Sequence, residues 1–379
     1  MAKIEGTVDQ KFTRVREALG DVLDAPHELG ASLSVVIDGK TVVDVWGGFT
    51  DRERTKPWKE DTLANVYSTT KGWLAICALR LVDQKKLDLD APVAQYWPEF
   101  AQNGKEKMPV RWLLSHRAAL PAIRETLEPN ALFDWNVMTN ALAAEKPWWE
   151  PGTKHGYHAI TYGWLVGEVI RRVSGVSPGE YFRRELAGPL ALDAYIGLDA
   201  SHDERCADLR FAKAEPGEPP TLVQYMMSNP ESVTTRAFTN PMLLASPTLT
   251  SMREFRGGEI PSINGHATAR AIASLYGAVA RGDVLSQSSV EAAAEEESRG
   301  IDEVLRVETR FGLGFMLSLP DDRFGPNEGS FGHPGAGGSV GFADPKTKLG
   351  FAFVPNRLGT RIKLDPRAVR LIDATYASL

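Results

Sequence analysis

The sequence predicts an α+β fold in which an antiparallel sheet, built from both ends of the chain and flanked by helices, carries an inserted, mostly helical domain. Hairpin patterns occur near both termini, and apolar residues recur at helical spacing through most of the middle. A chain of 379 residues, 43% hydrophobic and 24% charged, has a globular composition and room for two or three domains of roughly 100 to 200 residues each. A disordered or fibrous protein is excluded.

The amino-terminal segment is predicted to open with a helix that is followed by two paired strands. Residues 9–24 place apolar side chains at helical spacing. Residues 32–37 and 41–46 are rich in β-branched residues and flank Asp38 and Gly39, a pair typical of hairpin turns. The expected order is therefore helix, strand, strand.

The carboxy-terminal segment repeats this combination of hairpin and helix. Residues 339–343 and 349–354 are predicted to form strands around a turn at residues 344–347, and a helix is expected over residues 366–376. Strands from both ends of the chain would then share one sheet.

The middle of the chain is predicted to be helical. Helices are expected over residues 69–86, 110–116, 135–145, 160–174, 178–186 and 266–281. Residues 200–262 are rich in Pro, Ser, Thr and Met and lack a sustained period, which predicts a long irregular segment that lines a pocket. We expect an α/β domain over residues 1–66 and 265–379 and a helical domain over residues 67–264.

Charge and hydropathy exclude several classes of partner. The formal net charge is −6, and no long Lys/Arg run offers a basic face for nucleic acid. No stretch approaches the roughly 20 apolar residues that span a bilayer, so no membrane partner is expected. The amino terminus lacks the apolar core of a secretory signal, which predicts a cytoplasmic location. Cys77 and Cys206 are too far apart in sequence for a C-x-x-C motif, and neither a disulfide framework nor a cysteine zinc site is predicted.

Ser68-Thr69-Thr70-Lys71 fits the pattern S-x-x-K at the start of the helix predicted from residue 69. At this spacing a hydroxyl and an amine share one helix face, within hydrogen-bonding reach. A helix amino terminus also offers unpaired N–H groups that favour the oxyanion of an acyl-transfer reaction. Ser68 is therefore a candidate nucleophile, and a helix cap is the structural alternative.

Ser339 is a rival nucleophile, because residues 337–341 read Gly-Gly-Ser-Val-Gly and fit G-x-S-x-G. That motif requires a strand, a turn and a helix, whereas Ser339 leads into a predicted hairpin. The associated triad also places a histidine after the serine, and the last histidine of this chain is His333. We therefore favour Ser68.

The histidines do not have the spacing of a metal site, and neither a metal nor another cofactor is predicted. His155 and His158 lack the H-E-x-x-H context, and the other histidines are scattered. His116 could act as a base, but a histidine that ends a helix more often bonds the backbone.

Three segments together resemble the serine β-lactamase and penicillin-binding-protein superfamily, most closely its class C-like esterases, known as family VIII carboxylesterases. The first combines Ser68-x-x-Lys71 with residues 110–121, which are similar to the signature L-L-x-H-T-S-G-L. The second, residues 151–159, places Tyr157 on the catalytic tyrosine of a Y-S-N motif. The third, residues 333–338, is His-Pro-Gly-Ala-Gly-Gly, where penicillin-recognising members carry K-T-G. The resemblance runs over residues 30–356.

The resemblance implies a β-lactamase-like fold and assigns roles to individual residues. Ser68, Lys71 and Tyr157 are expected to be catalytic, and the backbone N–H groups of Ser68 and Ala336 to form the oxyanion hole. It further implies that His333, Gly335 and Ala159 contact the substrate. Because Ala159 replaces the motif's asparagine and His333 replaces the strand lysine, efficient β-lactamase action is not expected.

The expected function is therefore hydrolysis of short-chain carboxylic esters through an acyl-Ser68 intermediate. A serine hydroxyl needs a proton acceptor, and both Lys71 and Tyr157 have ordinary pKa values near 10. We favour Tyr157 as the base with the Lys71 ammonium stabilising the phenolate, and the reverse assignment stays open. Acyl transfer, amide or D-amino peptide hydrolysis, and a non-catalytic binding module are the alternatives; oligomeric state is not predicted.

Overall fold

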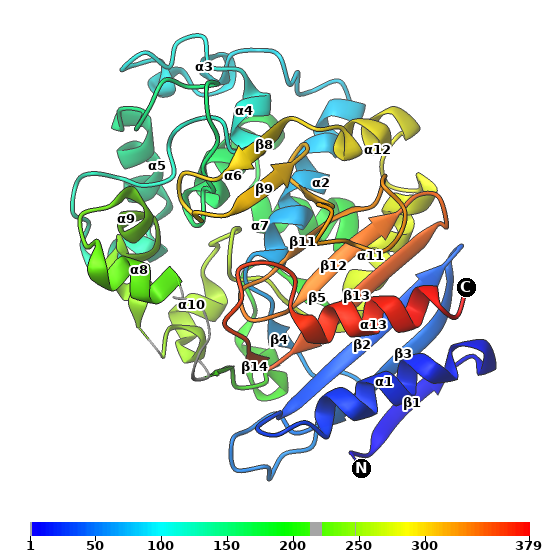
Figure 1. The fold of residues 1–379 in the computed structure, drawn as a ribbon. Coiled ribbons are helices and arrows are strands. Elements are labelled where there is room, and N and C mark those ends of the chain that lie inside the picture. The colour runs from blue at the N-terminus through cyan, green and yellow to red at the C-terminus, as the bar shows by residue number, and fades with distance from the viewer. Residues whose placement is uncertain (1, 213–221, 247) are drawn as a thin grey trace.

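The computed structural model describes residues 2–212, 222–246 and 248–379. Within those residues a nine-stranded antiparallel sheet runs in the order β1-β3-β2-β13-β12-β11-β10-β9-β8 (Figure 1). Its strands are β1 (Ile4–Val8), β2 (Gly30–Ile37), β3 (Lys40–Gly48), β8 (Ser298–Ile301), β9 (Glu308–Phe311), β10 (Met316–Leu317), β11 (Phe331–Pro334), β12 (Val340–Asp344) and β13 (Leu349–Pro355). Pairing of β2 with β13 joins the two ends of the chain, which confirms the predicted sheet.

The chain opens with β1, so the predicted order helix, strand, strand is wrong at its start. This strand pairs with β3 at the edge of the sheet, and its side chains are only half-buried or exposed. Gly6 has φ +96, which breaks the regular strand geometry at the middle of the five residues. A short edge strand of this kind has too few buried positions to produce a recognisable alternation.

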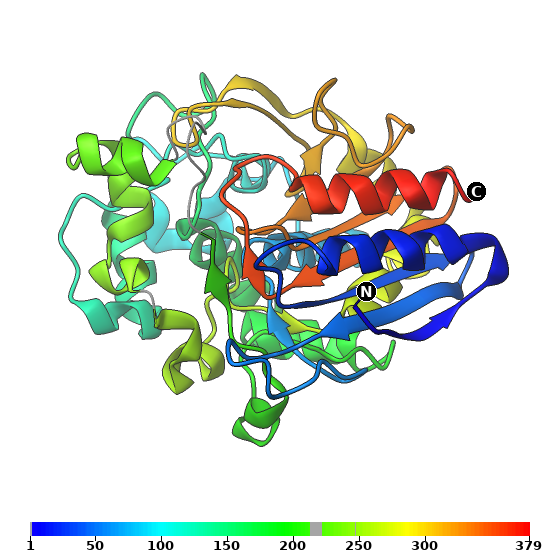
Figure 2. The ribbon, with the colours of Figure 1, turned by 60° about the horizontal axis from the view of Figure 1, so that its bottom comes forward.

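Helices cover both faces of the sheet. On one face α1 (Thr13–Leu23) and α13 (Pro366–Tyr376) pack side by side (Figure 2). On the other face α11 (Ala269–Arg281) packs against β2, β12 and β13. Side chains alternate accordingly along β13, where Phe351 and Phe353 join the core under α1 and α13 while Ala352 joins the core shared with α11. The central strands β2, β12 and β13 are therefore buried on both sides.

The helical region confirms the predicted helices with small shifts at their ends. These helices are α2 (Thr69–Asp83), α4 (Val110–Leu114), α5 (Trp135–Ala144), α6 (Thr161–Ser174) and α7 (Pro178–Phe182). A π turn, Arg183–Ala187, continues α7, and the helix expected from residue 266 begins only at Ala269, after the strand β7 (His266–Ala267). The remaining helices are α3 (Val93–Tyr96), α8 (Leu222–Ser228), α9 (Val233–Thr239), α10 (Arg253–Gly257) and α12 (Gln287–Ala294).

The segment expected to be irregular, residues 200–262, is only partly so. It contains α8, α9 and α10, of seven, seven and five residues, which bury none, two and one of their residues and so give no sustained apolar period. Residues 213–221 and 247 of this segment lie outside the described residues.

Two small sheets complete the fold. The strands β4 (Ala64–Asn65), β7 and β5 (Ala194–Tyr195) pair in that order, and β6 (Arg210–Phe211) pairs in parallel with β14 (Arg357–Leu358). In the first of these sheets, the strands β4 and β7 lie next to residues 67 and 264, which are the predicted limits of the helical domain. That division stays a prediction. In the part of the chain that the structure describes, no helix combines the length and the apolar character needed to cross a membrane.

Candidate active site

Ser68 lies at the amino-terminal end of α2, directly after a strained turn. Tyr67 has φ +44, a left-handed conformation that is unusual for a residue other than glycine. The side chain of Asn65 holds this turn, since its Oδ1 accepts the Tyr67 N–H at 3.3 Å and its Nδ2 donates to the Ile263 carbonyl at 2.9 Å. Buried residues such as Trp73 fix the following helix in the core. The local structure therefore presents Ser68 from a rigid helix end.

Lys71 is fully buried one turn further along α2, and its amine lies 3.1 Å from the Ser68 hydroxyl oxygen. Its two other partners are the carbonyl oxygens of Ala159, at 2.7 Å, and Ser262, at 3.0 Å. Burial holds the pKa of Lys71 well below its ordinary value. Carbonyl oxygens can only accept, whereas a hydroxyl can donate. A neutral amine that donates to both carbonyls therefore keeps its lone pair for the Ser68 proton.

Tyr157 lies on the loop that precedes α6, and its side chain approaches Ser68 and Lys71. Its ring is 5% exposed, lies 4.8 Å from the Lys71 amine and stacks on Phe311, with centroids 6.0 Å apart and planes 11° from parallel. Burial raises the pKa of Tyr157, and a hydrogen bond with the Ser68 hydroxyl acts in the opposite direction. The environment thus favours a neutral phenol. The structure brings Ser68, Lys71 and Tyr157 together, as the sequence predicts.

Asp302 holds the backbone of Tyr157 and was missed by the sequence analysis. Its Oδ1 accepts the N–H groups of Tyr157, at 3.0 Å, and of Val304 and Leu305, at 2.8 Å each. The carboxyl is fully buried, and burial raises its pKa although these backbone hydrogen bonds lower it. It lies 145 residues from Tyr157 in sequence, so no local pattern connects the two.

The glycine-rich turn after β11 lies against the residues that flank Ser68. A Cβ added at Gly335 would lie 2.2 Å from the Val66 carbonyl oxygen, so only glycine permits this approach. Ser339 secures the turn, because its buried hydroxyl donates to the same carbonyl at 2.8 Å and lies 3.2 Å from the Thr69 hydroxyl. Ser339 is therefore placed as an anchor of the turn rather than as an exposed nucleophile.

The two proposed oxyanion donors remain available in this arrangement. Ala336 is exposed at the tip of the turn, while the neighbouring Gly335 N–H is already bonded to the Ser339 carbonyl at 2.7 Å. Within the described residues, neither the Ser68 N–H nor the Ala336 N–H donates a hydrogen bond. Both groups can therefore serve a ligand.

His333 and Ala159 lie beside the cluster but carry neither a positive charge nor an amide. His333 is 1% exposed, and its Nδ1 bonds the Pro334 carbonyl at 2.7 Å. Burial, together with the nearby Lys71, lowers its pKa to about 3, so the ring is neutral. The Ala159 methyl is buried, and its carbonyl is a partner of Lys71. The sequence analysis missed the second such carbonyl, that of Ser262.

The other histidines of this region have structural partners. The Nδ1 of His116 accepts the His158 N–H at 3.1 Å, and His158 Nε2 accepts the Leu120 N–H at 3.0 Å. Burial lowers the pKa of both rings, that of His158 to about 3. His116 is thus placed as a support of the Tyr157 loop. Across the described ranges, no group of three or more His, Cys, Asp or Glu side chains is arranged to hold a metal ion.

The fold and this cluster define a class of protein. A serine at a helix start, a lysine one turn later and a tyrosine beside them, on an antiparallel sheet built from both termini, are the features of a β-lactamase-like fold. The chain belongs to the Beta-lactamase family, which matches residues 14–374.

Known relatives share nearly the whole chain. It is 35% identical over 369 residues to the "Esterase/beta-lactamase LipL" of Mycobacterium tuberculosis (strain ATCC 25618 / H37Rv), covering 94% of this chain and 83% of that protein. A penicillin-binding protein homolog from Caulobacter crescentus matches at a TM-score of 0.91 and 42% identity, over 100% of both chains. A family VIII carboxylesterase matches at a TM-score of 0.90 and 39% identity, also over 100% of both chains.

Proposed function

We propose that the protein is a carboxylesterase that cleaves short-chain esters through an acyl-Ser68 intermediate and acts weakly or not at all on β-lactams. The observation that carries the proposal is the placement of the Lys71 amine 3.1 Å from the Ser68 hydroxyl, with carbonyl oxygens as its other partners. Similarity to proteins named esterase and carboxylesterase supports ester hydrolysis.

The proton acceptor in this proposal is Lys71, the reverse of the assignment favoured by the sequence. Burial lowers the pKa of Lys71 and raises that of Tyr157, so the amine and the phenol are the preferred ground states. Neutral Lys71 takes the Ser68 proton as the serine oxygen bonds to the ester carbon. Tyr157 then protonates the departing alkoxide and recovers a proton from the Lys71 ammonium.

Hydrolysis of the acyl-enzyme uses the same amine. Neutral Lys71 takes a proton from water as the water oxygen bonds to the acyl carbon. The bond to Ser68 breaks, the serine oxygen takes that proton from the Lys71 ammonium, and the carboxylic acid leaves with Lys71 neutral again. In both steps the N–H groups of Ser68 and Ala336 stabilise the negative carbonyl oxygen. No other group is needed to balance protons.

The substrate class follows from what surrounds the cluster. A β-lactam presents a carboxylate and an acylamide, which a lysine and an asparagine would hold by charge-assisted and neutral hydrogen bonds. The neutral His333 ring and the Ala159 methyl offer neither contact. An ester carbonyl needs only the two N–H groups, and an alkoxide leaves more easily than an amine.

A panel of p-nitrophenyl esters of increasing acyl length, run beside nitrocefin, tests the proposal. We expect kcat/KM for the best short-chain ester to exceed that for nitrocefin by at least about a hundredfold, equivalent to roughly 2.7 kcal/mol. Comparable values, or a preference for nitrocefin, would instead assign the protein as a β-lactamase. Adding an alcohol acceptor and analysing the products separates hydrolysis from acyl transfer.

A further inference from the structure

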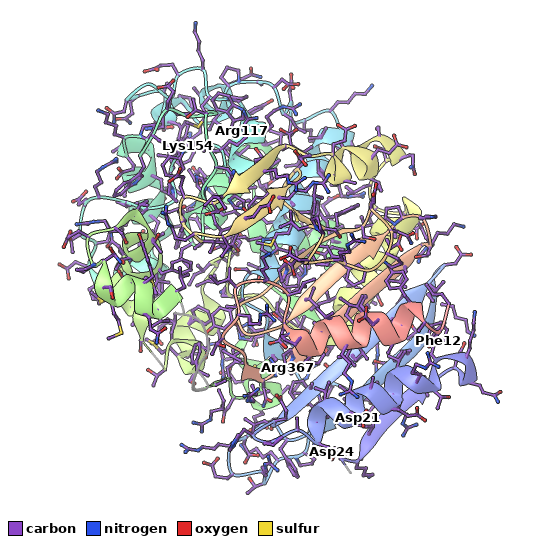
Figure 3. All side chains as sticks on the ribbon, viewed as in Figure 1. Phe12, Asp21, Asp24, Arg117, Lys154 and Arg367 are labelled. Carbon is purple, nitrogen blue, oxygen red and sulfur yellow. The ribbon has the colours of Figure 1, made fainter. Side chains whose placement is uncertain are left out.

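Arg367 lies near the amino-terminal end of α13 (Figure 3). It belongs to none of the motifs, yet it contacts the glycine-rich turn. Its Nη2 donates to the Gly337 carbonyl at 2.8 Å and to Asp365 Oδ2 at 2.9 Å. Its Nη1 donates to Glu28 Oε2 at 2.9 Å and to the Arg357 carbonyl at 3.0 Å, and its Nε donates to Asp365 Oδ1 at 2.8 Å. These contacts use all five N–H donors of the guanidinium.

The environment of Arg367 makes this contact rigid. The side chain is 12% exposed, and that of Glu28 is 4% exposed. Glu28 is itself held by Arg357, whose Nη1 lies 2.7 Å from Oε1. A buried fork with every donor occupied has one favourable orientation, because a rotation would break several charge-assisted bonds at once.

The turn is consequently fixed from two sides. Ser339 ties it to Val66 beside the nucleophile, and Arg367 ties it to α13. Gly337 also accepts the Gly359 N–H at 2.9 Å. Between these anchors lies Ala336, the residue next to Gly337. The Gly337 carbonyl and the Gly338 N–H share one peptide unit, and that N–H donates to the Gly335 carbonyl at 3.1 Å, in the same peptide unit as the Ala336 N–H. Through this hydrogen bond the direction of the Ala336 N–H depends on where Arg367 holds the Gly337 carbonyl.

We infer that Arg367 is a positioning residue for the oxyanion hole, acting on the Ala336 N–H through the Gly337 carbonyl. This inference rests on the proposed function, in which that N–H stabilises the carbonyl oxygen of the substrate. Arg367 does not touch the substrate. Without it the Gly337 carbonyl keeps the Gly359 N–H but loses its link to α13, and the Ala336 N–H loses its alignment with the developing oxyanion.

A comparison of oxygen and sulfur substrates tests the inference, because a thiocarbonyl sulfur accepts hydrogen bonds poorly and gains little from the hole. We measure kcat/KM for a p-nitrophenyl ester and its thionoester in the wild type and in Arg367→Met. Misplacing one donor should lower the ester value about 10- to 100-fold and the thionoester value much less. The ester-to-thionoester ratio should fall at least about tenfold. A fall of both values by one common factor would reflect lost folded protein and would overturn the inference.

Arg357→Met is the matched control, since it removes a second guanidinium from Glu28, and within the described part of the chain the Arg357 side chain donates no hydrogen bond to the turn. Its ratio should stay within about twofold of the wild type, and a fall equal to that of Arg367→Met would overturn the inference. If Arg367→Met does not fold, Arg367→Lys takes its place. A lysine cannot reach Gly337, Glu28 and Asp365 together, so the ratio should still fall, and an unchanged ratio rejects the inference.

Labelling of Ser68 by a fluorophosphonate and its thiophosphonate analogue gives the same comparison without ester turnover. The proposed function fails if the wild type labels at Ser68 but hydrolyses no ester. The inference fails separately, if the ratio of the two labelling rates is the same in the wild type and Arg367→Met.

Discussion

Lys71 and Arg367 are both basic side chains, one fully and one mostly buried, and they lie in opposite environments. Arg367 is bonded to two carboxylates, those of Glu28 and Asp365. Burial alone would lower its pKa, but the bonds to Asp365 and Glu28 raise it above the ordinary value. Among the described residues, the hydrogen-bond partners of the Lys71 amine are one hydroxyl and two carbonyl oxygens, and burial lowers its pKa.

The two environments give these two basic side chains different roles. A cation paired with carboxylates keeps its charge and serves as a fixed link between elements, here α13 and the glycine-rich turn. A cation surrounded by neutral oxygen atoms is costly to keep charged and can release its proton within reach of a nucleophile.

The largest effect on ester turnover is expected from removal of the proposed nucleophile, Ser68, whose hydroxyl lies beside the Lys71 amine. Ser68→Ala should lower ester turnover by several thousand-fold, because only substrate binding and the oxyanion hole remain. The variant should keep its circular dichroism spectrum and lose fluorophosphonate labelling. Turnover close to that of the wild type in a folded variant would reject the proposed nucleophile.

Ser339→Ala is the control for this experiment. Its hydroxyl bonds the Val66 carbonyl, so the substitution removes one buried hydrogen bond, a loss of about 1 kcal/mol in stability. Labelling at Ser68 should persist in this variant. A serine adduct that disappears in Ser339→Ala and persists in Ser68→Ala would reverse the assignment.

The pairing of Arg367 with carboxylates predicts a large effect on stability rather than on catalysis. Glu28→Gln removes a carboxylate that two guanidinium groups share in a buried site, and the free energy of unfolding should fall by about 3 kcal/mol or more. Urea denaturation measures the change. Asp9→Asn is the matched control, because its partner Lys40 is 70% exposed and the change should stay within about 1 kcal/mol. Equal losses would remove the distinction between buried and exposed pairs.

The neutral surroundings of Lys71 predict that Lys71 and Tyr157 act together in one proton transfer. Lys71→Met and Tyr157→Phe should each lower turnover by about a hundredfold or more. The double variant should lose much less than the product of the two, since either single change already interrupts proton transfer. Steady-state kinetics of the four proteins form the double-mutant cycle. Multiplicative losses would show that the two residues act independently.

The pH dependence of kcat/KM tests whether neutral Lys71 is the proton acceptor. If Lys71 must be neutral, activity should rise about tenfold per pH unit below its pKa and level off above it, because the ammonium cannot accept the Ser68 proton. The pKa values of His158 and His333 are lowered to about 3. Burial raises the pKa of Asp302, which holds the Tyr157 backbone, so an acidic limb above about pH 5 is assigned to Lys71 only if it disappears in Lys71→Met. A limb that persists in Lys71→Met would contradict the assignment.

The residues that sequence analysis found and those it missed differ in how their partners are spaced. Ser68 and Lys71 are one helical turn apart, and Tyr157 belongs to a recognisable motif, so their meeting could be predicted, although their roles stay proposals. Asp302 bonds a backbone group 145 residues away, and Arg367 bonds Glu28 across 339 residues. Isolated charged residues of this kind acquire their purpose only from tertiary contacts, which no local pattern encodes.

The fold shows the same division. The hairpins over β2–β3 and β12–β13 were predictable, because each alternates around a turn with favourable residues. The edge strand β1 and the short helices α8, α9 and α10 were not, because they bury few residues: none in β1 and α8, two in α9 and one in α10. The equally short helices α4 and α7 bury three and four of their five residues and were predicted, so period-based reasoning recovers buried elements and fails on exposed ones.

The smallest effect is the pH dependence of stability, and it separates the two cations most directly. Lys71 has a lowered pKa in the folded state, whereas the unfolded chain restores a value near 10.4, so unfolding takes up a proton between these two values. Raising the pH through that window should stabilise the wild type relative to Lys71→Met by about 1.4 kcal/mol per pH unit. Arg367 stays charged in both states, so the stability difference between wild type and Arg367→Met should not change over the same window.

Urea denaturation of the three proteins at pH 7, 8 and 9 measures both slopes. A flat difference for Lys71→Met would mean that Lys71 keeps its proton in the folded protein, and Tyr157 would then replace it as the proton acceptor.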